Sequence, residues 1–238
     1  MGPDRPDEFE PPEILQIPPT VVGGDPIEEK FLKRLGYGKK IETPRHIRTL
    51  SSSAIKQVLA SIEPKAIVAF TPISSISKDA IHACGVSVES PLWADLARRS
   101  GHPITMAVLA LTLGPLPDQD LSYEKTMNLT DRFMLHEAAS LVIELLADDL
   151  SERLENHKRV QGLHPLHRFS PGYCDIPLAV QAAFFHFLNP PAIGIRLCDS
   201  GAMIPSKSLT AAILFAPDPP ALSPCPQCDR QGCRHRRN

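Results

Sequence analysis

Proline is concentrated at the two ends of this chain, and its distribution limits where regular structure can form. Seven of the 25 prolines lie in residues 1–26 and five lie in residues 217–226, which leaves 13 for the long middle segment. Helix interiors and central strands avoid proline, because it lacks a backbone N–H and fixes φ. We therefore expect an acidic, proline-rich arm over residues 1–26, a folded domain over residues 27–216, and a proline-rich spacer with a basic cysteine tail over residues 217–238.

The overall composition is that of a globular chain with little net charge. Hydrophobic residues make up 42% of the 238 residues and charged residues 22%, so the middle segment can bury a core. With 25 basic and 27 acidic residues, the net charge is −2, which gives no general attraction for nucleic acid or for a membrane surface. The chain has no apolar run of the roughly 20 residues that span a bilayer. We expect a cytoplasmic protein with neither nucleic acid nor a membrane as its partner.

Helical and strand patterns are mixed along the middle segment without a regular βαβ repeat. Short apolar runs bounded by proline or glycine predict buried strands, and apolar residues at a period of about 3.6 predict helices. The predicted helices cover residues 27–35, 51–62 (capped at its start), 91–101 (capped by Ser90), 130–155 and 178–188; the predicted strands cover residues 65–72, 104–113, 193–198 and 209–215. This order favours an α+β fold with a twisted, largely antiparallel sheet flanked by helices.

The longest predicted helix, residues 130–155, has one apolar stripe and one polar face. The stripe consists of Leu135, Ala138, Val142, Leu146 and Leu150. The opposite face consists of Glu137, Ser140, Glu144, Asp148 and Glu155. Such a polar face is usually solvated, which is what we expect for this one.

Two segments contain groups that suit a small polar ligand. Residues 168–173 (RFSPGY) combine a Pro-Gly turn, an arginine fork that can bind a carboxylate, and a tyrosine ring. An ordinary Pro-Gly turn with a surface arginine is the alternative. Residues 198–205 (CDSGAMIP) place Asp199 and Ser200 where a predicted strand ends, although such turns are common and Cys198 also fits a buried structural thiol.

The C-terminal tail contains a Cys-x2-Cys-x4-Cys motif made by Cys225, Cys228 and Cys233. Three thiolates at this spacing can bind one metal ion or cluster, so we predict a metal site. A fourth ligand is missing from the motif, and His235, Cys174, Cys198, solvent or substrate are candidates for it. Zinc and an iron-sulfur cluster both remain open, and the alternative is a disordered tail with incidental thiols.

Taken together, the two ligand-type segments resemble the paired signature of the activation domain of cobalamin-dependent methionine synthase. That family shows Arg-x-x-Pro-Gly-Tyr, then a helix, then Gly-x-x-Leu-x-Asp/Glu-Ser-x-x-Met-x-Pro. This chain has the first motif at residues 168–173 and the second at residues 194–205. The helix around Glu144 and the segments 31–38 and 112–114 also resemble parts of family members, so the resemblance extends over residues 27–216.

The resemblance implies that the domain binds S-adenosylmethionine as methyl donor for an oxidised corrinoid that needs reactivation. Arg168 would contact the donor's carboxylate, Ser170 and Gly172 would offer backbone contacts, and Tyr173 would line the pocket beside the methyl group. Glu144 would attract the cationic donor. Asp199 and Ser200 would support the loop from behind. No side chain is expected to perform acid-base catalysis.

The resemblance also implies partners. We expect the chain to be an accessory component and not a complete methionine synthase, because it lacks the homocysteine, folate and corrinoid modules. Its partner would be a separate corrinoid-binding methionine synthase core without an activation domain, with an electron-transfer protein as a second partner. The cysteine tail would relay the electron through an iron-sulfur cluster. Two alternatives stay open: a reactivator of another corrinoid methyltransferase, and a non-catalytic metal-binding adaptor.

Overall fold

The structure is a computed structural model that describes residues 10–19, 25–37, 41–115 and 128–218. Its strands are β1 (Glu10–Gln16), β2 (Lys65–Ile76), β3 (Ala80–Ala83), β4 (Val86–Glu89), β5 (Thr105–Thr112), β6 (His164–Pro165), β7 (Arg196–Leu197), β8 (Met203–Ile204) and β9 (Ser208–Ala216). Its helices are α1 (Asp25–Arg34), α2 (Arg45–Ser61), α3 (Pro91–Arg99), α5 (Leu129–Arg159), α6 (Val180–Leu188) and the short 3-10 helix η2 (Pro190–Ile193).

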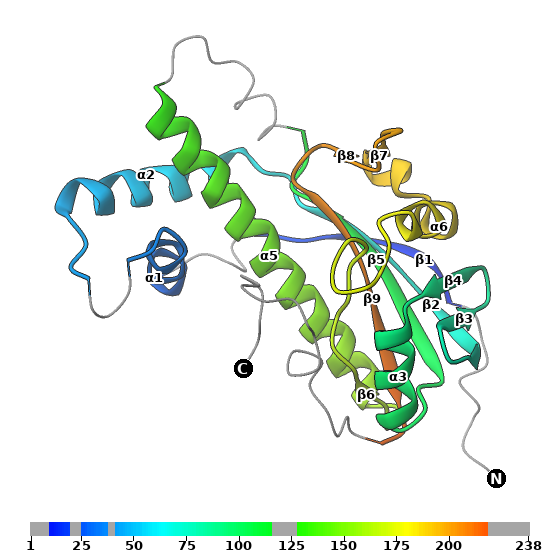
Figure 1. The fold of residues 1–238 in the computed structure, drawn as a ribbon. Helices are drawn as coiled ribbons and strands as arrows, with labels where there is room; N and C mark the ends of the chain where they lie inside the picture. The colour runs from blue at the N-terminus through cyan, green and yellow to red at the C-terminus, as the bar shows by residue number, and fades with distance from the viewer. Residues whose placement is uncertain (1–9, 20–24, 38–40, 116–127, 219–238) are drawn as a thin grey trace.

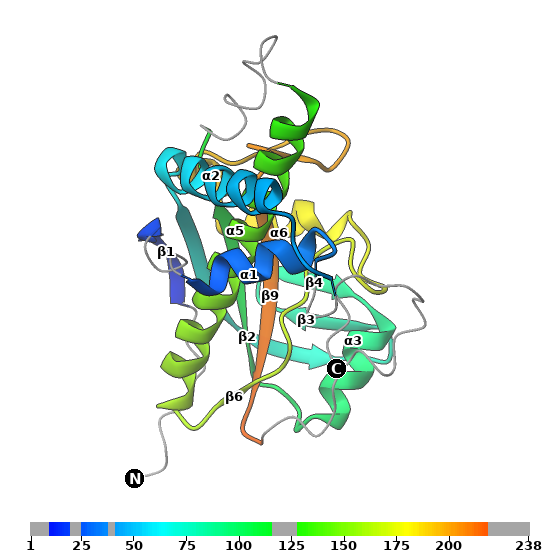
Figure 2. The same cartoon turned by 90° about the vertical axis from the view of Figure 1, so that its left-hand side faces the viewer.

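The main sheet is antiparallel throughout, and the α+β prediction is confirmed. Its strand order is β4-β3-β2-β5-β9-β6, with β1 pairing to β2 as well, while β7 and β8 form a separate small hairpin. Figure 1 shows the twisted sheet with α5 on one side and α3 and α6 on the other, and Figure 2 shows α1 and α2 lying over the α5 side. In the described parts of the chain, no helix is both long and apolar enough to span a bilayer.

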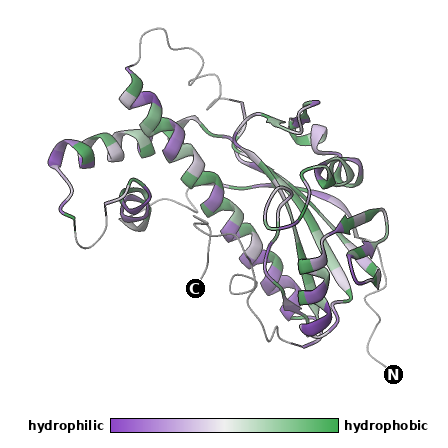
Figure 3. Cartoon of the chain, in the orientation of Figure 1, coloured by the Kyte–Doolittle hydropathy of each residue, from purple (hydrophilic) through white to green (hydrophobic). Residues whose placement is uncertain are grey.

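The central strand β5 is buried along its whole length because helices cover both faces of the sheet. Alternate residues of this strand enter two different cores. Ala107, Leu109 and Leu111 pack with α2 and α5, whereas Met106 and Val108 pack with α3 and α6. The continuous green of the central strands in Figure 3 reflects this double burial. A strand of this kind reads as an unbroken apolar run, which is how the sequence predicted it.

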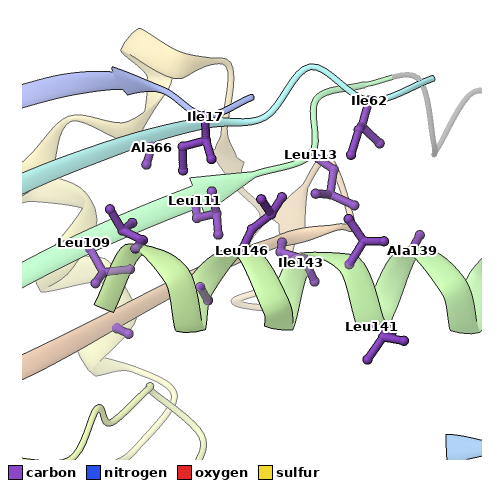
Figure 4. Packing of buried hydrophobic residues seen from close by; sticks show 14 of the residues in the cluster. Ile17, Ile62, Ala66, Leu109, Leu111, Leu113, Ala139, Leu141, Ile143 and Leu146 are labelled. Carbon is purple, nitrogen blue, oxygen red and sulfur yellow. The ribbon is translucent and has the colours of Figure 1, made fainter. Parts of the chain in front are cut away.

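Helix α5 contributes most of the core on its side of the sheet. The five residues of the predicted apolar stripe are all buried, as expected. Figure 4 shows Leu146 projecting from α5 toward Leu111 of β5, while Leu141 projects from another side of the helix. Leu141 is also buried, because α1 and α2 cover that side. Asn128 caps the start of the helix, and its side chain accepts the backbone N–H of Asp131 at 2.9 Å.

Several predicted boundaries were wrong. Helix α2 begins at Arg45 after Pro44, so Ser51 is a buried residue within the helix and not its cap. The predicted strand over residues 193–198 is interrupted, because η2 ends at Gly194 with φ +86° and only Arg196–Leu197 remain extended as β7. Part of the segment expected to be an arm, Glu10–Gln16, is strand β1. The hairpin of β3 and β4 was not predicted.

Candidate functional site

Residues 168–176, called the arginine loop below, connect β6 to the segment before α6 and are fixed to the sheet at Phe169. The backbone of Phe169 donates to Ala212 of β9 at 2.9 Å and accepts from it at 2.8 Å. The Phe169 ring is buried and lies 5.2 Å from the ring of Trp93, centroid to centroid. Because neighbouring side chains of an extended segment point to opposite sides, Arg168 faces the other way, toward α5.

Arg168 binds two residues of α5. Its Nη1 donates to Ser151 Oγ at 2.9 Å and its Nη2 donates to Asp148 Oδ1 at 3.0 Å. The Arg168 side chain is only 14% exposed, whereas that of Asp148 is 54% exposed. The arginine is therefore held in place by the helix. Asp148 is exposed, as predicted for the polar face of this helix, and it also pairs with a partly buried cation, which was not predicted.

The turn of the arginine loop is built around Gly172. This residue has φ +84°, a value that glycine adopts without steric cost. Its N–H donates to the carbonyl of Ile176 at 3.0 Å, and the N–H of Tyr173 donates to the carbonyl of Ser170 at 3.1 Å. The Tyr173 side chain follows directly and is 41% exposed. The loop is thus closed by its own backbone bonds and presents Tyr173 at the surface.

Asp175 fixes the end of the arginine loop to α3. Its Oδ1 accepts the hydroxyl of Ser90 and its Oδ2 accepts the N–H of Leu92 at 2.7 Å. Ser90 in turn accepts the N–H of Trp93 at 3.0 Å, which confirms it as the cap of this helix. The sequence analysis did not single out Asp175. A serine cap before Pro91 predicts where α3 begins, but it does not indicate that a residue 85 positions later completes the cap.

The second predicted segment forms a tight turn over residues 198–202, called the serine turn below. The N–H of Cys198 donates to Ala202 O at 2.8 Å, and Gly201 N–H donates to Cys198 O at 2.9 Å. Ser200 Oγ lies 3.4 Å from the N–H of Ala202 and accepts it. Asp199 and Ser200 are both exposed. The turn connects β7 to β8, so Asp199 and Ser200 lie just after a strand, as the sequence predicted.

Helix α6 brings the serine turn against the arginine loop. Gln181, which is 4% exposed, donates from Nε2 to the carbonyl of Gly201 at 2.7 Å. Leu178 touches both segments: a Cβ built on Gly172 would lie 3.6 Å from one of its methyl carbons, and a Cβ built on Gly201 would lie 3.1 Å from the other. The two predicted segments therefore meet in space although α6 separates them in sequence.

Glu144 lies on α5 one turn before Asp148 and also has a basic partner. Arg34, the last residue of α1, places Nη1 4.0 Å from Glu144 Oε1 and donates from Nε to Glu137 Oε2 at 2.7 Å. We call Glu137, Glu144 and Asp148 the acidic face of α5. The Glu144 side chain is 41% exposed, so this face is half-buried and paired rather than fully solvated.

The structure does not describe the three cysteines of the predicted metal site. Cys225, Cys228 and Cys233, and the candidate ligand His235, all lie outside the described residues. Cys174 is exposed and Cys198 is partly buried, and neither forms a disulfide bond within the described residues. Within residues 10–19, 25–37, 41–115 and 128–218, no three His, Cys, Asp or Glu side chains gather closely enough to hold a metal ion.

Comparison with known proteins shows the fold. The chain is similar to the MetH reactivation domain in a crystal structure of that domain bound to AdoHcy, with a TM-score of 0.64 and 14% sequence identity over 90% of this chain and 81% of that one. No model of a protein family and no curated protein matches the chain. The fold therefore resembles that of the MetH reactivation domain, at a low sequence identity.

Proposed function

We propose that this chain binds S-adenosylmethionine at the arginine loop, which contacts α5 through Arg168 and the serine turn through Leu178, and that it is a reactivation subunit for a separate corrinoid-binding methionine synthase. The observation that carries the proposal is the meeting of the two predicted segments at Leu178, with Arg168 reaching from one of them to α5. The likeness of fold to a domain solved with AdoHcy supports the class of ligand.

Arg168 is the residue proposed to bind the carboxylate of the donor. A guanidinium carries five N–H donors, so its bonds to Asp148 and Ser151 are compatible with a further carboxylate. Those two bonds also fix the plane of the guanidinium before any ligand arrives, and a preorganised donor loses less conformational entropy on binding. The low exposure of Arg168, 14%, strengthens the attraction by reducing solvent screening.

The remaining contacts are proposed for the backbone and the ring of the arginine loop. Because the N–H of Gly172 already donates to Ile176, its contact with a ligand falls to the carbonyl oxygen. The carbonyl of Ser170 already accepts the N–H of Tyr173, so its contact with a ligand would use the second lone pair of that oxygen. Tyr173 offers a half-exposed aromatic face beside the turn, where it would lie against the methyl-bearing sulfur.

Glu144 is proposed to attract the positive charge of the donor from the acidic face of α5. It lies one helical turn from Asp148, which holds Arg168, so a zwitterionic ligand would find the guanidinium of the loop at one turn of α5 and a carboxylate at the next. Asp199 and Ser200 are proposed to support the loop without contacting the ligand. The bond that Ser200 Oγ accepts from Ala202 fits that role, because it stabilises the serine turn.

S-adenosylmethionine, when bound, supplies a methyl group on a cationic sulfur to a nucleophilic acceptor held by the partner protein. The residues of this chain bind and orient the donor and hold it in place for the transfer. Proximity and orientation alone account for large rate effects in such reactions, so the site needs no general acid or base. The arrangement of an arginine, a half-exposed ring and a distant carboxylate fits a binding role.

Titration calorimetry of the full chain with S-adenosylmethionine and with S-adenosylhomocysteine tests the proposed ligand. We expect saturable binding of both with one ligand per chain, and no binding of adenosine monophosphate, which carries an anionic phosphate in place of the zwitterion. The absence of heat and of a thermal shift with both ligands would contradict the proposal.

The partner is tested separately, by adding the chain, the methyl donor and a reductant to an inactive corrinoid methionine synthase core and following the methylcobalt absorption spectrum.

We further propose that Cys225, Cys228 and Cys233 bind a metal site that takes part in delivering the electron. The support is their Cys-x2-Cys-x4-Cys spacing next to a domain whose fold resembles that of a reactivation domain. Anaerobically purified chain is expected to contain iron and sulfide, and Cys228→Ala is expected to lose them while still binding S-adenosylhomocysteine. Colourless protein with stoichiometric zinc would exclude an electron relay and leave a structural site.

A further inference from the structure

Arg34 connects α1 to two carboxylates of the acidic face of α5 in different ways. Its Nε donates to Glu137 Oε2 at 2.7 Å, a hydrogen-bonded ion pair, whereas its Nη1 lies 4.0 Å from Glu144 Oε1. Glu137 and Glu144 are seven residues apart, which places them two turns apart on the same side of the helix. The guanidinium is therefore anchored on Glu137 and only approaches Glu144.

The position of Arg34 is not needed to dock α1. Phe31 of this helix is fully buried, and Ile27 and Leu32 are each 5% exposed, so apolar contacts hold α1 in place. The side chains of Arg34, Glu137 and Glu144 are 31%, 23% and 41% exposed. Ion pairs this accessible contribute little to stability. The main effect of Arg34 is instead to place a positive charge beside Glu144.

Among the described residues, Arg34, Arg168 and Lys207 all contact this side of α5, and of these the Arg34–Glu144 distance, 4.0 Å, is longer than the two given next. Arg168 lies 3.0 Å from Asp148, and Lys207 lies 2.8 Å from Ser140, one turn before Glu144. Unlike Arg168, Arg34 keeps a second carboxylate when Glu144 turns toward a ligand, because Glu137 holds it. Glu144 can thus exchange one cation for another without leaving Arg34 unpaired.

We propose that Arg34 is a specificity-determining residue that competes with the sulfonium of S-adenosylmethionine for Glu144. This inference rests on the proposed function. The methyl donor and its product S-adenosylhomocysteine differ by one methyl group and one positive charge, so a carboxylate near the sulfur is the group that distinguishes them. A resident guanidinium at that carboxylate reduces its attraction for a second cation and leaves the neutral product unaffected. Arg34 therefore sets how strongly the site prefers donor over product.

The test measures the affinity of one variant for both ligands. For Arg34→Ala, the ratio of donor affinity to product affinity is expected to rise about two- to fivefold, the range of a partly exposed ion pair. A general disturbance of α1 changes both affinities and cancels in the ratio. Arg34→Lys keeps the charge and is expected to keep the wild-type ratio. In the Glu144→Gln background, Arg34→Ala is expected to leave the ratio unchanged.

Arg153→Ala is the matched control. Arg153 places Nε 2.7 Å from Asp149 Oδ2, so the variant also removes one positive charge that is paired with a carboxylate of α5, but Asp149 is about 100° around the axis from Asp148. Its ratio should equal that of the wild type. A wild-type ratio in Arg34→Ala, or an equal rise in Arg153→Ala, overturns the inference alone. A wild-type chain that binds neither ligand overturns the proposed function and this inference with it.

Discussion

Arg168→Ala is expected to weaken the binding of S-adenosylmethionine about ten- to hundredfold, because a hydrogen bond between charged groups contributes about 1.5–3 kcal/mol. The lost group is 14% exposed and fixed by two residues of α5, so water replaces it poorly. The same loss is expected for S-adenosylhomocysteine, which keeps the carboxylate. Calorimetry with both ligands gives the two affinities and shows whether they fall together.

Arg168→Lys distinguishes the shape of the group from its charge. A lysine keeps the charge but cannot donate to Asp148, Ser151 and a ligand carboxylate in one plane, so we expect intermediate affinity. Arg196→Ala removes an exposed arginine from the neighbouring strand β7 and is expected to leave binding unchanged. Wild-type affinity in Arg168→Ala would mean that the arginine serves only to tie the loop to α5.

The fold was predictable where local sequence and burial agree. The continuous apolar runs at β2 and β5 predicted buried strands, because a strand covered on both faces is apolar at every position. The stripe of residues 135–150 predicted the long helix, because a helix packed on a sheet is apolar on one side only. Ser90 and Pro91 predicted the start of α3 for an equally local reason. The antiparallel α+β arrangement followed from these elements.

The contacts that shape the candidate site were not predictable, because they join residues far apart in sequence. Helical periodicity placed Asp148 on a polar face but gave no information that Arg168 would pair with it across 20 residues. Arg34 lies 103 residues from Glu137, and neither residue carries a local signal for the other. Glu144 was named from a family resemblance and not from its helix, whose periodicity alone indicated solvent.

Boundary errors had a similar origin. Ser51 has the chemistry of a helix cap, yet α2 continues through it because the apolar residues on both sides of it pack against α5. The turn at Gly194 interrupts what periodicity read as one strand, since its φ of +86° is incompatible with an extended chain. Tertiary packing therefore overrode the cap signal at Ser51, and one backbone angle interrupted the strand pattern at Gly194.

Leu146→Ala is expected to lower the free energy of unfolding by about 2–5 kcal/mol, the range for truncating a buried leucine. Leu146 is fully buried and projects from α5 toward Leu111 of the sheet (Figure 4). Because α5 also carries Glu144 and Asp148 on its acidic face, a cavity behind the helix is expected to loosen the site as well.

Leu145→Ala provides the comparison, since the adjacent leucine is only partly buried and its truncation removes the same atoms. We expect it to cost less than half as much as Leu146→Ala. Urea denaturation followed by circular dichroism measures both, with an unchanged m-value showing that the transition remains cooperative. Equal losses in the two variants would contradict the packing of α5 described above, because they would mean that both sides of the helix at this turn are equally enclosed.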